Sequence, residues 1–199
     1  MTALLPTVAA AAGTFAVTNV DDIVVLTALF ATAGRGGPSR SQIVFGQYLG
    51  IAALVAVSAI AALGLLVVPD RWVGLLGLVP IALGVRGLLA ARKARNDDSV
   101  HRLAAPVRGT LGVAGVTIAN GADNISIYTP LFRQAGADGL VVYAVAFAVL
   151  VAVWSAAGLL LAGRQPVVAL LDRAGHWLVP VMFIVIGLVI VATSGLRSG

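Results

Sequence analysis

The chain of 199 residues contains no cysteine and has few charged side chains. Without cysteine it can form neither a disulfide nor a thiolate metal site. Charged residues make up 11% of the chain, whereas soluble domains have roughly 25%, so the composition argues against a water-soluble domain. The phosphate-binding pattern GxxxxGK[ST] is also missing, which argues against ATP as the direct source of energy unless a partner subunit provides it.

Apolar residues dominate what is present, at 60% of the chain. A membrane-spanning helix needs about 20 mainly apolar residues, and we find six such stretches, at residues 7–33, 42–68, 72–91, 109–132, 139–163 and 177–195. We therefore expect an all-α membrane protein in which residues 1–199 form a single transmembrane domain. The connections are too short for a separate soluble domain, and no cofactor is expected.

The basic residues are distributed unevenly between the two sides of the predicted membrane. Six spans with an external amino terminus leave Arg71, Arg133 and Arg197 outside. The other ten lie on the cytoplasmic side, namely Arg35, Arg40, Arg86, Arg92, Lys93, Arg95, Arg102, Arg108, Arg164 and Arg173. Basic residues gather in cytoplasmic loops, so we predict external termini and a cytoplasmic loop at 92–107. The net charge of +5 is thereby explained without nucleic acid.

The second half of the chain resembles the first after a shift of 102 residues. This shift places TNVDDIVVLTALF (18–30) over NGADNISIYTPLF (120–132) without a gap and with five identical positions. We predict a first repeat at 1–91 and a second at 108–196. Because each repeat holds three spans, the second enters the membrane from the opposite side, giving two inverted three-helix repeats. This design is typical of secondary transporters, whose substrate sites lie where the repeats meet.

Three aspartates lie within these apolar stretches: Asp21, Asp22 and Asp123. A charged residue at the centre of a membrane helix costs about 2.5–3.5 kcal/mol, so their presence requires a reason. On a regular helix Thr18, Asp21 and Asp22 share one face, and Asn120, Asp123 and Asn124 share another. Such oxygen donors, without thiols or nearby bases, suit a divalent cation. Gly121 and Pro130 should weaken regular helix near the second group.

Polar residues in a span also have a purely structural interpretation, as hydrogen-bonding groups between helices, with the aspartates protonated. We favour that interpretation for Gln47 and Tyr48, and regard Tyr128 as a better candidate for the transport pathway. For carboxylates repeated at equivalent positions we favour function. A different function, an intramembrane aspartyl protease, would use two aspartates that share a proton. At Asp123 the sequence reads GAD and not the protease motif GxGD, which disfavours a protease.

The motifs TN-x-DD at 18–22 and NG-x-DN at 120–124 resemble those of the CadD-type cadmium resistance transporter family, within the LysE exporter superfamily. The likeness extends over nearly the whole chain. It implies efflux of cadmium, with zinc or manganese as further candidates, across the bacterial cytoplasmic membrane. Carried over by position, the family motifs fall on Thr18, Asn19, Asp21, Asp22, Asn120, Gly121, Asp123 and Asn124.

The carboxylates further suggest a proton antiporter in which they carry either metal or protons. The expected metal-binding residues are Asp21, Asp22, Asp123, Asn124, Asn120, Asn19 and Thr18. The expected partners are a divalent cation, protons and membrane lipid, and faces rich in small residues leave room for a homodimer. An amino-acid exporter of the same superfamily is the alternative. Three carboxylates without a midplane cation suit a substrate carboxylate poorly.

Overall fold

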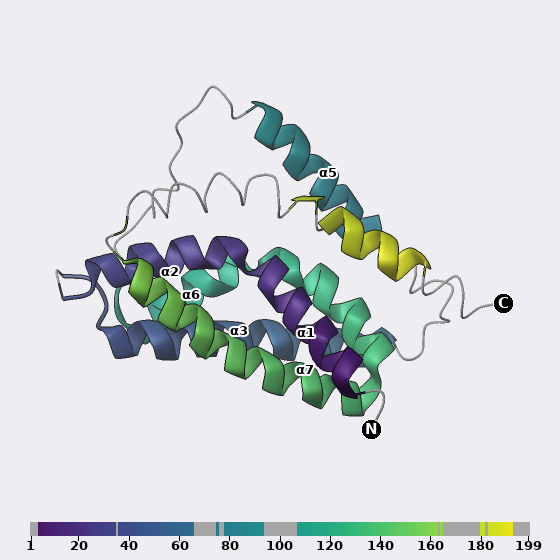
Figure 1. Cartoon of the computed structure of the whole chain (residues 1–199), viewed down its shortest axis with the longest axis horizontal. Coiled ribbons are helices and arrows are strands. Elements are labelled where there is room, and N and C mark those ends of the chain that lie inside the picture. The colour runs from purple at the N-terminus through teal and green to yellow at the C-terminus, as the bar shows by residue number, and fades with distance from the viewer. Residues whose placement is uncertain are drawn as a thin grey trace.

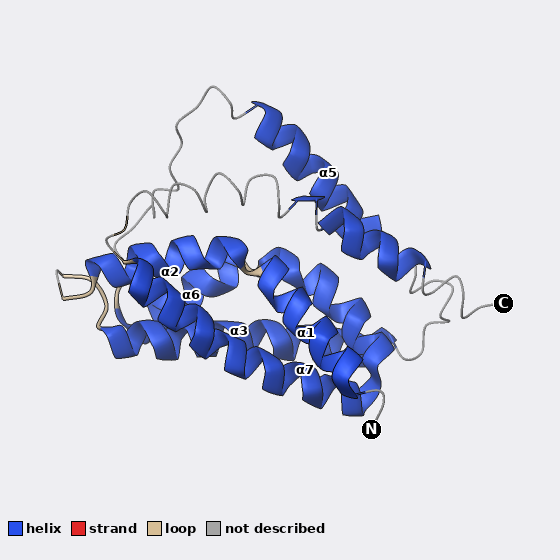
Figure 2. Cartoon of the chain, in the orientation of Figure 1, coloured by secondary structure: helices blue, strands red, loops and turns tan. Residues whose placement is uncertain are grey.

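The computed structural model describes residues 4–34, 36–65, 75, 78–93, 107–162, 164, 180–181 and 183–192. In this part of the chain all regular structure is helical (Figures 1 and 2), which confirms the expected all-α class. The helices are α1 (Leu4–Thr18), α2 (Val20–Thr32), α3 (Arg40–Gly64), α5 (Leu78–Lys93), α6 (Gly109–Asn120), the 3-10 helix η4 (Ala122–Asn124) and α7 (Ile125–Leu161). A short apolar helix follows at Phe183–Ala192.

The first expected span, 7–33, is a broken helix. It consists of α1 and α2, which meet at Asn19 with a bend of 59°. Asn19 leaves the helical region, with φ −119° and ψ 22°. Its side-chain nitrogen donates a hydrogen bond to the carbonyl of Phe15 at 2.9 Å, the same carbonyl that its backbone N–H contacts at 3.0 Å. A side chain that bonds nearby backbone in this way competes with regular helix.

The expected span at 109–132 is broken at the corresponding position. Helix α6 ends at Asn120, Gly121 adopts φ −98° and ψ 12°, and the turn of η4 separates it from α7. The weakening expected at Gly121 is therefore confirmed, whereas Pro130 continues within helix α7. The two break residues, Asn19 and Gly121, are 102 residues apart, the shift that also superposes the polar motifs.

Helix α7 reverses direction at Gly136. The backbone there has φ 70° and ψ −175°, which is not helical and which glycine adopts without steric cost. The rings of Tyr128 and Phe147 lie 5.0 Å apart, although 19 residues of continuous helix would separate them by roughly 28 Å. Residues 125–135 and 137–161 are therefore two antiparallel segments, which agrees with the expected boundary between spans 109–132 and 139–163.

By length and composition, two segments of the described chain can cross a membrane, α3 and the residues 122–161, or three if the bent pair α1–α2 counts as one span. The reversal at Gly136 divides 122–161 further. The expected spans 72–91 and 177–195 are described only in part, by α5 and by the helix at 183–192. Most of the expected loop 92–107 lies outside the described residues.

Helix α3 is the long element against which both α6 and α7 pack. It begins with a capping box, in which the Ser39 hydroxyl accepts from the backbone of Gln42 and the Gln42 side chain accepts from the backbone of Ser39. Two glycines allow α6 to approach closely, because a Cβ atom at Gly46 or Gly50 would lie 2.5 Å from the Cβ atom of Val113 or Thr117. This close approach positions the polar contacts of the site.

An aromatic cluster occupies the core between α1 and the two segments of α7. The side chains of Phe15, Tyr128, Phe132, Tyr143 and Phe147 are all nearly or fully buried, and their rings contact one another. Large apolar side chains also cover the outside of the helices, including Ile60, Leu111 and Leu160 at 70%, 77% and 73% exposure. Such an apolar exterior is what a membrane protein presents to lipid.

Candidate metal-binding site at the two helix breaks

The break between α1 and α2 is held by a buried hydrogen-bond network. The Tyr128 hydroxyl lies 3.0 Å from the Thr18 hydroxyl and accepts from the side-chain nitrogen of Asn19 at 3.0 Å. The same nitrogen donates to the Thr18 hydroxyl at 2.9 Å, and the indole N–H of Trp154 donates to the Asn19 carbonyl at 2.7 Å. Thr18 and Asn19, two of the expected ligands, therefore hold the break together.

Asp22 lies at the start of α2 and is buried, with 1% of its surface exposed. Its Oδ2 accepts a hydrogen bond from the side-chain amide of Gln47 on α3, and the Oε1 of Gln47 accepts from the Thr117 hydroxyl on α6 at 2.7 Å. Three helices are thereby connected through one carboxamide. Among the described residues the other carboxylate oxygen of Asp22, Oδ1, has no hydrogen-bond partner.

Asn124, at the equivalent position of the second predicted repeat, also has a buried oxygen without a partner among the described residues. It is 1% exposed, and its Oδ1 has no hydrogen-bond partner within the described chain. Asp22 and Asn124 are separated by 102 residues, so equivalent positions of the two predicted repeats each carry one buried acceptor oxygen that is left unpaired. Unpaired buried acceptors are rare because each loses its interaction with water, and they call for an explanation such as a missing ion.

Asp21 connects the two breaks more directly. Its Oδ1 accepts from the backbone N–H of Asp22 at 2.9 Å, and its carboxylate lies near the Asn120 side chain and near Asp123. Asp21 and Asp123, which are 102 residues apart, are therefore close enough for their charges to interact. Both stand in the first turn of a helix that begins at a break, where the partial positive charge of the helix terminus offsets a carboxylate.

The prediction of one oxygen-rich helical face in each repeat is wrong. It assumed regular helix through residues 18–22 and 120–124, whereas both segments are broken. As a result Asp22 and Asn124 point into the protein, Asp21 is half-buried, and Asp123 is exposed. Within the described residues no three histidine, cysteine, aspartate or glutamate side chains form a group that could hold a metal ion. A cation here would need neutral oxygens as well.

Gln47 bonds between helices, as the sequence predicts, and Thr117 is a residue of the site that the sequence analysis does not single out. Together they hold one oxygen of the buried carboxylate. A signal for Thr117 was its place one turn before Asn120, on the face next to the motif. Tyr48 does have the structural role expected of it, since its hydroxyl donates to the carbonyl of Ala148 at 2.9 Å.

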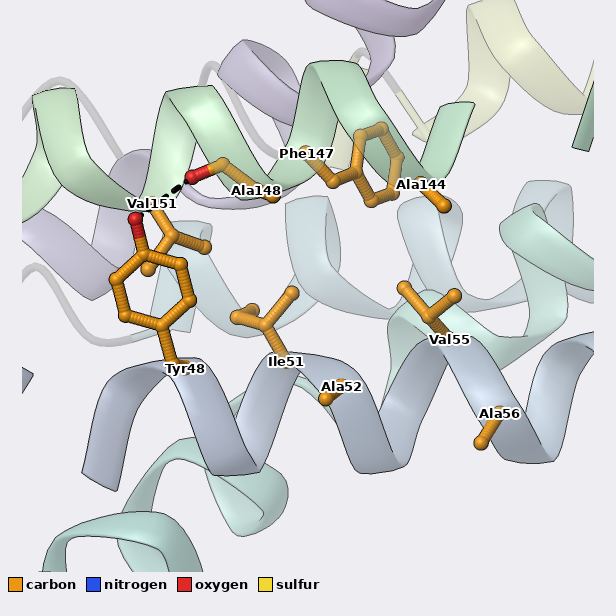
Figure 3. A pocket seen from close by; sticks show the side chains of 9 residues that line it. All are labelled: Tyr48, Ile51, Ala52, Val55, Ala56, Ala144, Phe147, Ala148 and Val151. Carbon is orange, nitrogen blue, oxygen red and sulfur yellow. Dashed lines mark hydrogen bonds between the residues drawn. The ribbon is translucent and has the colours of Figure 1, made fainter. Parts of the chain in front are cut away.

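A cavity of about 230 Å³ lies between α3 and the second segment of α7 (Figure 3). Its walls are mainly apolar, with Ile51, Val55 and Phe147 among them, and the hydroxyl of Tyr48 is used by its bond to α7. None of the expected metal ligands lines this cavity. An apolar cavity is unsuited to a hydrated cation, so the polar breaks remain the better candidate site.

Comparison with known proteins identifies a family for this chain. Residues 15–198 match the model of the family described as cadmium resistance transporter. The matched range includes both helix breaks and the three aspartates of the polar motifs. Neither a curated protein nor a solved structure matches the chain.

Proposed function

Since the chain belongs to the cadmium resistance transporter family, and is therefore a transporter and not an enzyme, we propose that it exports divalent heavy-metal cations from the cell. Cadmium is the principal substrate in this proposal, and zinc and manganese are further candidates. The membrane is the bacterial cytoplasmic membrane, and the family belongs to the LysE exporter superfamily. The metal is the cargo, so no resident cofactor is required.

The observation that carries the proposal is that two of the buried oxygens without a hydrogen-bond partner in the described chain, Oδ1 of Asp22 and Oδ1 of Asn124, are 102 residues apart, at equivalent places in the two motifs. A cation satisfies buried acceptors that lack donors, and carboxylate and carboxamide oxygens are accepted ligands of divalent ions. Asp21 and Asp123, which lie near each other at the same breaks, supply further negative charge. Asn120 beside them contributes a carboxamide. Thr18 and Asn19 complete the proposed site by holding the break in place.

The proposal includes six spans arranged as two inverted repeats. Figure 1 shows α1 and α2 running in the opposite direction to α6 and the first segment of α7, as inverted copies must. Along both α3 and the second segment of α7, buried residues recur every four positions, at Gly46, Gly50, Leu54 and Ser58 and at Tyr143, Phe147, Val151 and Ser155. Discontinuous helices at a repeat interface are a common form of transporter binding site.

Proton antiport is the proposed source of energy. The chain lacks the phosphate-binding motif, and a carboxylate must be deprotonated before it binds a metal ion. Protons that bind from the outside would therefore displace the metal there, and metal would displace protons inside. External termini, with residues 92–107 in the cytoplasm, follow from the six-span arrangement and the distribution of basic residues.

Transport by the purified protein in liposomes tests the proposal. We expect cadmium movement that an imposed pH gradient accelerates, and we expect Asp22→Asn to reduce it by at least about tenfold, as for loss of a group beside a metal. Asp138→Asn is the matched control because Asp138 is exposed near the turn of α7, away from the breaks. Cadmium flux that survives Asp22→Asn, or amino acids that compete with cadmium, would contradict the proposed site.

A further inference from the structure

Gln47 has both ends of its carboxamide occupied. Its oxygen accepts from the Thr117 hydroxyl, so its nitrogen must face Asp22, to which it donates. The side chain is 1% exposed, and both of its hydrogen bonds are buried. Gln47 therefore presents a fixed donor to one oxygen of Asp22.

The fixed donor changes what Asp22 can offer to a metal ion. A free carboxylate can bind a cation through both oxygens, but Oδ2 of Asp22 already accepts a hydrogen bond, whereas Oδ1 has no partner in the described chain. The donor held on Oδ2 competes with a cation for that oxygen, so Asp22 favours binding a cation through Oδ1 alone. Asn124, at the equivalent position, likewise offers one carboxamide oxygen, so Gln47 makes the two halves of the site alike despite their different charges.

We propose that Gln47 is a specificity-determining residue, which restricts Asp22 to a single ligand oxygen and thereby favours cadmium over calcium. The inference rests on the proposed function. Calcium takes six to eight oxygen ligands, often including a bidentate carboxylate, and its affinity increases with the number of charged ligands. Cadmium is a softer ion and depends less than calcium on hard, anionic oxygen ligands. A site with one anionic ligand oxygen fewer therefore loses more affinity for calcium than for cadmium.

The test compares cadmium transport with its inhibition by calcium, using purified protein in liposomes. Gln47→Leu removes the donor while keeping a similar volume, which leaves both oxygens of Asp22 free to bind metal. We expect the ratio of the calcium inhibition constant to the cadmium KM to fall by about tenfold. A merely structural defect lowers the amount of active protein and the maximal rate, but leaves this ratio unchanged.

Two further variants complete the experiment. Thr117→Val keeps the shape of the side chain and removes the hydroxyl that anchors Gln47. The ratio of the calcium inhibition constant to the cadmium KM should therefore fall, but by less than in Gln47→Leu. Ser58→Ala is the control, because Ser58 is a fully buried polar residue on the same helix whose hydroxyl has no hydrogen-bond partner among the described residues. If the wild-type protein exports cadmium and the ratio is unchanged in both Gln47→Leu and Thr117→Val, the role of Gln47 is refuted. A wild-type protein without cadmium transport would overturn the proposed function as well.

Discussion

The close packing of α3 against α6 provides a sharp prediction for Gly50→Ala. A Cβ atom at this position would lie 2.5 Å from Cβ and 2.6 Å from Cγ2 of Thr117, whereas carbon atoms pack at about 3.5 Å or more. The two helices must therefore separate locally by about 1 Å. The 2.7 Å hydrogen bond from Thr117 to Gln47 would lengthen to about 3.7 Å, beyond the range of such bonds.

Two quantities should change in Gly50→Ala. Overpacking of this kind costs about 1–3 kcal/mol of stability, which thermal unfolding in detergent measures. Cadmium transport in liposomes should fall further than stability alone explains, because Gln47 loses the anchor that directs it toward Asp22. The rate is therefore compared at equal amounts of folded protein and at a temperature well below the unfolding transition.

Gly64→Ala is the matched control for this experiment. Gly64 belongs to the same helix, and a Cβ atom there would meet no described atom within 4 Å. Alanine within a helix is favoured over glycine by roughly 0.5–1 kcal/mol, so this variant should be at least as stable as wild type and transport normally. If Gly50→Ala transports cadmium as well as Gly64→Ala does, the site does not depend on close approach of α3 and α6.

Three other predictions follow from the breaks and the repeat. Asn124→Asp should bind cadmium more tightly but export it more slowly, since the added carboxylate holds the cation; calorimetric titration at two pH values checks this, and equal affinities with no pH dependence would argue against proton exchange. Trp154→Phe removes the donor to the Asn19 carbonyl and should cost about 1–3 kcal/mol of stability, which an unchanged melting temperature would contradict. Cysteines introduced at Ser99 and Ser198 should be labelled by an impermeant reagent from inside and outside respectively, and external labelling at 99 would refute the inverted repeats.

The structure divides the expected ligands into two groups with different roles. Thr18 and Asn19 use their polar groups on Tyr128 and on nearby backbone, which agrees with the structural interpretation of polar residues in spans. Asp22 and Asn124 instead retain unpaired oxygens, which that interpretation does not explain. Substitutions in the first group should therefore affect stability more than ion selectivity, and those in the second should do the reverse.

Local sequence determined the helical class, the apolar segments and the polar motifs, because hydrophobic length and composition act over short stretches of chain. The sequence also predicted the weakening at Gly121, but it did not predict the break at Asn19, which lies 102 residues earlier. The residues next to Asn19 carry no glycine or proline that would predict a break. The side-chain hydrogen bonds of Asn19 to Phe15 and Tyr128 form only in the folded protein.

Tertiary structure decided which side-chain oxygens of the motifs are buried and which of them lack a hydrogen-bond partner in the described chain. Helical spacing placed Asp123 and Asn124 on one face, but the 3-10 turn after Gly121 exposes the first and buries the second. The partner of Asp22 is 25 residues away along the chain and the anchor of that partner is 70 residues further. Contacts between such distant residues depend on how closely the helices approach, here through Gly50, and no local pattern records that distance.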